Sequence, residues 1–250
     1  MKKSAPWGDS IDTLKHSMPL GDWYNNQWPE LPYGVFRLPD YYSFDLAEMR
    51  EQIKQVTDNN PTVSIQSSKE GKRFNRYRGL GFFSRKDSEA PLEDHFLRRD
   101  ENYGVVYPTD LHLQSKLPAL YEGDFTEHTE IYNDYFDRVF SKFKSRISKA
   151  SILEMRAGGW LGSHVDFPYY KGIRLHASIS GCSNAWYEVN GERFQIPEDG
   201  HWYFFDTGKY HSAWNEGPDH RVTLNVNLDV FAKRNLDTRD IQVLSNNFLV

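Results

Sequence analysis

The chain has 250 residues, a formal net charge of −5 at pH 7 and 15% aromatic residues. The negative charge gives no general attraction to nucleic acid or to acidic membranes, and the aromatic content excludes the composition of a disordered chain. The length fits one large globular domain, so we expect a single domain over residues 1–250.

The sequence carries one cysteine, Cys182, which excludes an intramolecular disulfide and indicates a reducing compartment. Its place at the end of an apolar strand favours a small buried thiol over a nucleophile. No apolar run approaches the ~20 residues that a membrane-spanning helix needs, and the polar start of the chain lacks a signal core. We therefore expect a cytoplasmic protein with no membrane association.

Residues 1–150 are expected to form an N-terminal arm and a helical support. Prolines and aromatic residues mix in residues 1–42, which favours an extended arm over a long helix. Ser43 or Asp45 can cap a helix that runs to about Asn60, because apolar residues recur there at helical spacing.

A second helix is expected from about Glu127 to Ser148. Apolar residues form one stripe along this segment, and Lys and Arg gather near its end, where the helix dipole favours cations. Both helices are expected to pack against a sheet.

Basic and aromatic residues are interleaved between Lys69 and Lys86. Such mixing can hold a nucleotide strand or an anionic substrate, and of these we prefer a substrate carboxylate. The favoured interpretation is simpler: a solvated surface hairpin, balanced by the acidic residues between Glu89 and Glu101.

From Ser151 onward the pattern changes to short strands. Residues 151–156 alternate between apolar and polar side chains, and Gly158 and Gly159 break this strand. Further along, Asn190 and Gly191 supply the positive φ angles of a type I′ turn.

That turn predicts a hairpin of residues 185–189 and 192–196. Short strands after a helical half predict a mainly β, α+β fold: a double-sheet jelly roll backed by the N-terminal helices. The jelly-roll catalytic core is expected over residues 151–232, followed by a C-terminal tail over residues 233–250.

Three residues of this core have the pattern of a metal site. His164 and Asp166 are two residues apart, so on a strand they project from one face and can bind one ion together. His211 follows a later strand-like run and is the expected third ligand. Two imidazoles and one carboxylate form the facial triad of non-haem Fe(II) oxygenases, which leaves the other positions open. His201 is the competing candidate for the third ligand.

Two arginines extend this pattern toward a carboxylate co-substrate. Arg221 lies in the strand-like run after His211, and its planar guanidinium suits a carboxylate, which suggests 2-oxoglutarate. Arg174 and His176 share one face of another strand and are expected to point toward the same cavity as the metal ligands.

Several separated motifs between residues 153 and 230 resemble the aspartyl/asparaginyl β-hydroxylase family of Fe(II)/2-oxoglutarate oxygenases. In chain order the motifs are Ile173–His176, Gly181–Cys182, Pro197–Gly200, Phe205–Asp206, His211–Asn215 and Arg221. The resemblance implies a double-stranded β-helix (a cupin-like jelly roll), His164 and His211 as iron ligands, Arg221 on the distal carboxylate of 2-oxoglutarate, and Arg174 with His176 near its metal-binding end.

Asp166 departs from part of that family. The peptide-hydroxylating members lack this carboxylate, whereas the bacterial free-proline hydroxylases of the same broad family have it. A third protein ligand leaves no vacant site for chloride, so hydroxylation is expected over halogenation. We expect a dioxygenase that uses Fe(II), 2-oxoglutarate and O₂ to hydroxylate an unactivated C–H bond of an amino acid or of an amino-acid side chain in a peptide or protein. The alternative is a cupin-like protein that binds a metal or a small acid without catalysis.

Overall fold

The computed structural model describes residues 30–31, 35–60, 63–64, 74–96, 98–100, 104–106, 124–143, 146–164, 166 and 173–229. The arm expected over residues 1–42 falls within them only at 30–31 and 35–42, and the expected C-terminal tail lies outside the described residues.

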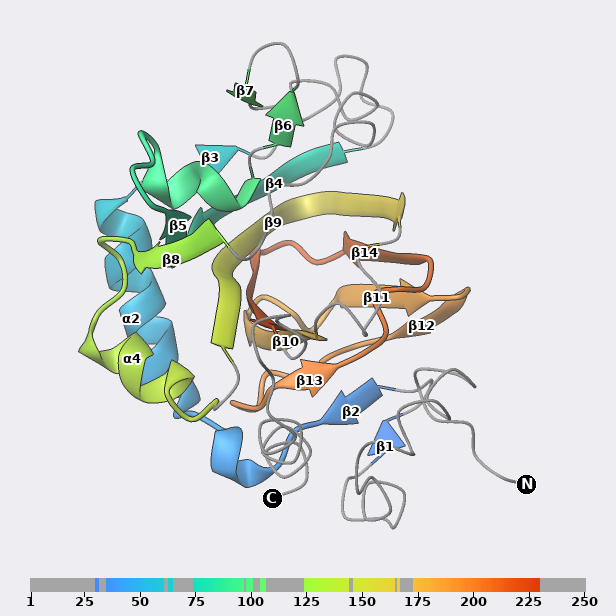
Figure 1. Cartoon of the computed structure of the whole chain (residues 1–250). Helices are drawn as coiled ribbons and strands as arrows, with labels where there is room; N and C mark the ends of the chain where they lie inside the picture. The colour runs from blue at the N-terminus through green and yellow to red at the C-terminus, as the bar shows by residue number, and fades with distance from the viewer. Residues whose placement is uncertain are drawn as a thin grey trace, which may run out of the picture.

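The fold is built on one curled antiparallel sheet of eleven strands (Figure 1). Its strands are β1 (Glu30–Leu31), β2 (Val35–Arg37), β3 (Val63–Ser64), β4 (Phe74–Gly81), β9 (Arg146–His164), β10 (Ile173–Ser180), β11 (Ala185–Val189), β12 (Glu192–Phe194), β13 (Tyr203–Phe204), β14 (His211–Asn215) and β15 (Arg221–Asp229). The order is β1-β2-β13-β10-β15-β9-β14-β11-β12, and β4 joins β3 to β9. The expected jelly roll of the double-stranded β-helix type is confirmed.

The long strand β9 connects the two halves of the curled sheet. Residues 146–155 pair with β15, and residues 160–164 pair with β14. Between these stretches Gly158 has a φ of +67°, a conformation that a residue with a Cβ rarely adopts. The sequence predicted that the two glycines end this strand, and that prediction is wrong. They mark the place where one continuous strand changes partner.

The inner and outer faces of β15 differ in chemistry. Leu224, Val226 and Leu228 pack into the apolar core between the sheet and the helices. Arg221 and Thr223 alternate with them and are also buried, but they face the interior of the curled sheet, since neighbouring strand residues point to opposite faces. The same alternation holds on the paired strand β10. One inner wall of the barrel is therefore buried and polar.

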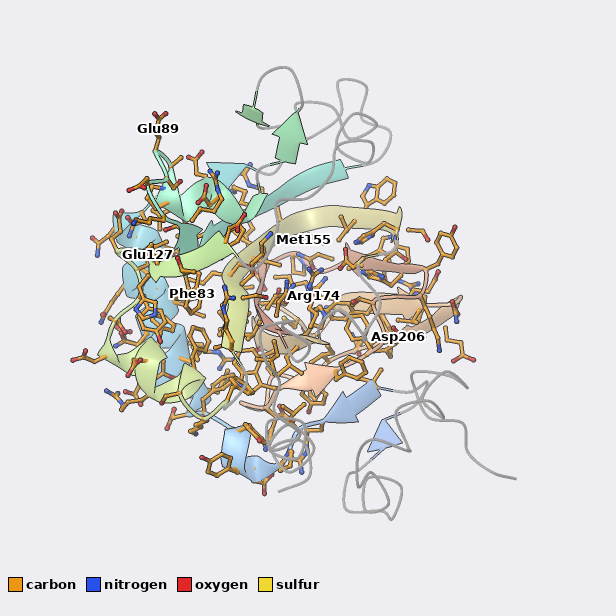
Figure 2. The ribbon with its side chains drawn as sticks, viewed as in Figure 1. Phe83, Glu89, Glu127, Met155, Arg174 and Asp206 are labelled. Atoms are coloured by element: carbon orange, nitrogen blue, oxygen red, sulfur yellow. The ribbon has the colours of Figure 1, made fainter. Side chains whose placement is uncertain are left out.

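A second, smaller apolar core lies in the interior of the curled sheet. It is formed by Val35, Met155, Tyr187, Val189, Phe194, Ile196, Tyr203, Phe205 and Ala213. Figure 2 shows Met155 and Arg174 between the two halves of the curled sheet, whereas Phe83 lies on the side of the helices. Polar and apolar side chains thus meet inside the curled sheet, where Arg221 and Met155 are cross-strand partners.

Helix α2 (Leu46–Asn59) confirms the first helix expected from the sequence. Asp45 caps it by accepting the backbone N–H of Glu48, and Met49, Ile53 and Val56 are buried. Together with α4 (Asp134–Phe140) it lies along one side of the sheet (Figure 1).

The prediction of one long helix over residues 127–148 is wrong. Strand β8 (Phe125–His128) pairs with β5 (Phe83–Arg85), Asn133 caps α4, and the helix ends at Phe140. From residue 146 the chain is already in β9, because its main-chain groups pair with β15. Tertiary pairing here prevails over a helical stripe of apolar residues.

Strands from the first 150 residues also extend the sheet, beyond the arm and helical support that the sequence predicted. β2 pairs with β13, and β4 pairs with β9. Other short elements are η4 (Asp40–Tyr42), η5 (Pro91–Phe96), and the pair β6 (Arg98–Asp100) and β7 (Gly104–Val106).

The hairpin of β11 and β12 confirms its predicted turn. Asn190 and Gly191 have φ angles of 52° and 85°, as a type I′ turn requires. Among the described residues, no helix is long and apolar enough to cross a membrane.

Candidate functional site

The three predicted metal ligands converge at the junction of β9 and β14. His164 ends β9 and His211 begins β14, and their Cα atoms are direct cross-strand partners. Asp166 follows β9 by two residues, and its backbone N–H donates to the carbonyl of Thr207 at 2.9 Å. The sheet therefore brings together side chains that are far apart in the sequence.

The ligand atoms lie close enough to share one ion. Asp166 Oδ1 is 3.7 Å from His164 Nε2, and Asp166 Oδ2 is 3.6 Å from His211 Nε2. All three ligand atoms lie within 4.8 Å of one another, and within the described part of the chain no other group of His, Cys, Asp and Glu has this arrangement. Neighbouring ligands ~2.1 Å from an octahedral ion lie about 3 Å apart, so small side-chain rotations bring the site onto a metal.

Both imidazoles present the same nitrogen to the centre of the site. His164 Nδ1 lies 2.8 Å from the Gly162 carbonyl, and His211 Nδ1 lies 2.9 Å from the Lys209 carbonyl. Donation of Nδ1–H to a carbonyl leaves Nε2 with its lone pair, which is how metal-binding histidines are held. Burial and the neighbouring His211 lower the pKa of His164, which favours the neutral form that a metal binds.

One tight turn supports two of the three ligands. Asp206 Oδ1 accepts the backbone N–H of Gly208 at 3.0 Å, and the Asp206 carbonyl accepts from Lys209 at 3.2 Å. The turn so formed presents the Thr207 carbonyl to the backbone of Asp166 and the Lys209 carbonyl to His211. Burial raises the pKa of Asp206 itself.

Arg174 contacts the third ligand directly. Its Nη1 donates to Asp166 Oδ2, and its Nε donates to Asn227 Oδ1 at 2.8 Å. Burial alone pushes the pKa of Asp166 upward, but the Arg174 cation and the two imidazoles outweigh it and hold that pKa well below its usual range. The carboxylate is therefore ionised and ready to bind a cation.

His176 and Arg221 lie on the polar inner wall beside the triad. His176 is 5% exposed and stacks on Phe205, with ring centroids 4.4 Å apart. Arg221 is 4% exposed, and its Cζ lies 4.1 Å from the centroid of the Tyr187 ring. Burial lowers the pKa of His176 well below 6.5, and the charges of Arg174, His211 and Arg221 lower it further.

This wall also carries buried polar atoms without partners. Both ring nitrogens of His176 lack a hydrogen-bond partner among the described residues. The hydroxyl of Ser151 lacks one as well. Buried polar groups are nearly always paired in folded proteins, so unpaired ones call for a missing ligand or water. A small polar molecule that reaches His176 between two arginines fits this wall, and a dicarboxylate has the matching charge.

His201 does not join the metal ligands. Its Nε2 lies 3.0 Å from Arg37 Nη1 and 3.1 Å from Asp40 Oδ1, and its Nδ1 lies 3.0 Å from the carbonyl of Asp199. Of the two candidates, His211 is the one that lies beside His164 and Asp166.

Most of the described side chains of the basic and aromatic segment between Lys69 and Lys86 pack into the fold or form ion pairs within it. Arg78 pairs with Glu154 at 3.1 Å, and Arg85 pairs with the fully buried Asp94 at 2.9 Å. Phe82 and Phe83 are buried in the core beside the helices. The side chains from Lys69 to Tyr77 lie outside the described residues.

Two further features lie away from the triad. Cys182 is buried and free, and burial raises its pKa, which agrees with an inert thiol. An open pocket of about 310 Å³ is lined by Phe83, Phe125, Phe140 and neighbouring residues. These aromatic residues belong to the core between sheet and helices, so the pocket lies on the other side of the sheet from the metal ligands.

Sequence reasoning missed Asn227, Ser151 and the turn at Asp206. One signal was present: Arg221, Thr223, Asn225 and Asn227 alternate with apolar residues, a period that predicts one polar face along β15. That this face is buried follows only from the closure of the sheet.

The residues 122–230 match the aspartyl/asparaginyl β-hydroxylase family. This segment contains all six residues that the sequence had assigned to iron and 2-oxoglutarate, namely His164, Asp166, Arg174, His176, His211 and Arg221. The family resemblance stated from the sequence motifs is thereby confirmed.

Several solved structures resemble the chain at low identity. An oxidoreductase of the 2OG-Fe(II) oxygenase family from Burkholderia pseudomallei is 13% identical with a TM-score of 0.45, over 79% of this chain and 86% of that one. A conserved protein of unknown function from Streptococcus pyogenes is 17% identical with a TM-score of 0.27, over 32% of this chain and 63% of that one. The cupin domain of an XRE-family transcriptional regulator from Enterobacter cloacae is 15% identical with a TM-score of 0.28, over 32% and 79%. The match thus spans less than two thirds of the Streptococcus protein. No curated protein matches the chain.

Proposed function

We propose that the protein is an Fe(II)- and 2-oxoglutarate-dependent dioxygenase that hydroxylates an unactivated C–H bond of an amino acid, or of an amino-acid side chain in a peptide or protein. The observation that carries this proposal is the convergence of His164, Asp166 and His211 beside a buried polar wall. The family match over residues 122–230 supports the same class of reaction.

The donor set fits Fe(II). Two imidazole nitrogens and one carboxylate on one side of an ion leave the opposite positions for exchangeable ligands, as this class of oxygenase requires. When bound, Fe(II) with 2-oxoglutarate and O₂ supplies the oxidising power for C–H hydroxylation, and the co-substrate is converted to succinate and CO₂. Asp166 would occupy the ligand position that a halide needs, which favours hydroxylation.

Three residues of the polar wall, Arg221, His176 and Arg174, would hold 2-oxoglutarate. Arg221 would bind its distal carboxylate, because a buried guanidinium forms strong charge-assisted hydrogen bonds with a carboxylate. His176 and Arg174 would lie near its metal-binding end, where the unpartnered nitrogens of His176 are available to it. The apolar cluster with Phe205 and Tyr187 would exclude water from the reacting groups.

Substitution of each metal ligand tests the proposal. We expect His164→Ala, Asp166→Ala and His211→Ala to lose bound iron and iron-dependent formation of succinate from 2-oxoglutarate while the fold survives, because an open catalytic site contributes less to folding than a closed structural one. His201→Ala is the matched control, since this histidine binds Arg37 and Asp40 elsewhere in the fold. Iron content, succinate and circular dichroism are measured together.

Two outcomes would contradict the proposal. Wild-type protein that binds iron but never converts 2-oxoglutarate, with any amino acid or peptide offered, would indicate the alternative of a non-catalytic cupin-like binding protein. Full activity of His211→Ala would reassign the third ligand.

A further inference from the structure

The carboxylate of Asp166 has two chemically different surroundings, one at each oxygen. Oδ2 accepts the Nη1 donor of Arg174 and lies 3.6 Å from His211, whereas Oδ1 lies 3.7 Å from His164. A guanidinium on Oδ2 competes with a cation for that oxygen, which favours Oδ1 as the oxygen that binds an ion. The side of the carboxylate that meets the metal therefore depends on where Arg174 is held.

Asn227 holds Arg174 from the other side. The two residues are direct cross-strand partners on β10 and β15, and Asn227 Oδ1 accepts the Nε donor of Arg174 at 2.8 Å. Asn227 is 1% exposed, so its amide is fixed by the surrounding strands. An acceptor at Nε and a carboxylate at Nη1 fix the plane of a guanidinium, whose donors have a rigid geometry.

We propose that Asn227 is a positioning residue for the metal site, acting through Arg174 to make Asp166 a one-oxygen ligand through Oδ1. The inference rests on the metal site of the proposed function, and it adds a residue whose side-chain oxygen accepts from Arg174. Removal of a partner that orients a metal ligand typically lowers the metal affinity by about 10–100-fold.

The test is a double-mutant cycle read out as Mn²⁺ affinity. Mn²⁺ binding is followed by the electron paramagnetic resonance signal of the free ion, without 2-oxoglutarate. We expect Asn227→Leu to weaken Mn²⁺ binding about tenfold or more when Arg174 is present. In an Arg174→Met background the same substitution should change affinity less than about twofold, because residues that act through one another are not additive.

Two further variants separate positioning from general damage to the fold. Thr223→Val removes a buried polar group from the same face of β15 and should leave Mn²⁺ affinity unchanged. Asn227→Asp keeps an acceptor for Arg174 Nε and should bind Mn²⁺ more tightly than Asn227→Leu. Asn227→Ala replaces the leucine variant if that variant does not fold.

Equal losses of affinity in both Arg174 backgrounds, or no loss in either, would overturn the role of Asn227. A wild-type protein that binds no Mn²⁺ would instead overturn the metal site itself. The failure of the inference and the failure of the proposed function are therefore distinguishable.

Discussion

Arg221 combines deep burial with a position on the polar inner wall. It is 4% exposed and lies over the ring of Tyr187. Its planar pair of donors suits a carboxylate, and burial strengthens such a charge-assisted pair. At the scale of single residues, this arginine is the strongest candidate for binding the distal carboxylate of 2-oxoglutarate.

We expect Arg221→Ala to raise the Michaelis constant for 2-oxoglutarate by roughly one to two orders of magnitude, since a charge-assisted hydrogen bond contributes about 1.5–3 kcal/mol. Arg221→Lys should restore only part of the loss, because a point charge lacks the planar pair of donors. Initial rates of succinate formation at varied 2-oxoglutarate give the constant. An unchanged constant in Arg221→Ala would move this role to Arg174.

His176 makes the stability of the apoprotein depend on pH. Its folded-state pKa lies well below the unfolded value of 6.5. Below pH 6.5 the unfolded chain therefore binds a proton here that the folded chain does not, and the free energy of unfolding falls as pH falls, by up to about 1.4 kcal/mol per pH unit. This contribution to the pH dependence is absent above the unfolded pKa.

Replacing His176 by leucine removes that proton uptake. We expect urea unfolding of His176→Leu to lose less stability than wild type between about pH 7 and about pH 5.5. Both proteins are measured without metal. The same loss in the two proteins would show that His176 is protonated in the folded state.

At the scale of elements, the turn from Asp206 to Lys209 is the part that assembles the triad. Its carbonyls hold the backbone of Asp166 and the ring of His211, which come from the ends of different strands. The turn depends on the contact between the Asp206 carboxyl group and the N–H of Gly208.

Asp206→Ala should therefore lower metal affinity by about tenfold, because the partners that orient metal ligands contribute on this scale. Asp206→Asn keeps an oxygen for the Gly208 N–H and should retain most of the affinity. Iron or Mn²⁺ titration of the two variants makes the comparison. If Asp206→Asn loses as much as Asp206→Ala, the charge of Asp206 matters rather than the turn.

At the scale of the whole molecule, the interior of the barrel combines an apolar cluster with a row of buried polar residues, and the helices cover only its outside (Figure 1). The outer core stabilises the fold without any ligand. The inner polar wall stays incompletely paired, since His176 and Ser151 have buried atoms without described partners. Ligands that complete this wall should stabilise the entire fold.

We expect Zn²⁺ with 2-oxoglutarate to raise the melting temperature by roughly 5–10 °C at concentrations of ~100 times the dissociation constant, which corresponds to about 2.7 kcal/mol of binding linkage. Zn²⁺ is redox-inert and prevents turnover. Either ligand alone should give a smaller shift in a thermal melt. If 2-oxoglutarate adds nothing to the effect of Zn²⁺, the polar wall binds something else.

The sequence by itself determined the features that depend on near neighbours along the chain. Ser43 or Asp45 before an apolar stripe predicted the start of α2, where Asp45 is the cap, and Asn190 with Gly191 predicted the hairpin turn. The choice of His164, Asp166 and His211 followed from residue types and strand periodicity, and the structure brings these three side chains together. Local spacing and side-chain chemistry are sufficient for such predictions.

Only the tertiary structure decided where distant segments pair. The apolar stripe after Glu127 is compatible with a long helix, but pairing with β15 places residues from Arg146 onward in a strand. The partner of Arg174 was likewise open, because a guanidinium suits any carboxylate, and the closure of the sheet sets Asp166 on one side of it and Asn227 on the other. These outcomes depend on contacts between residues far apart in sequence, which the pattern along the chain does not contain.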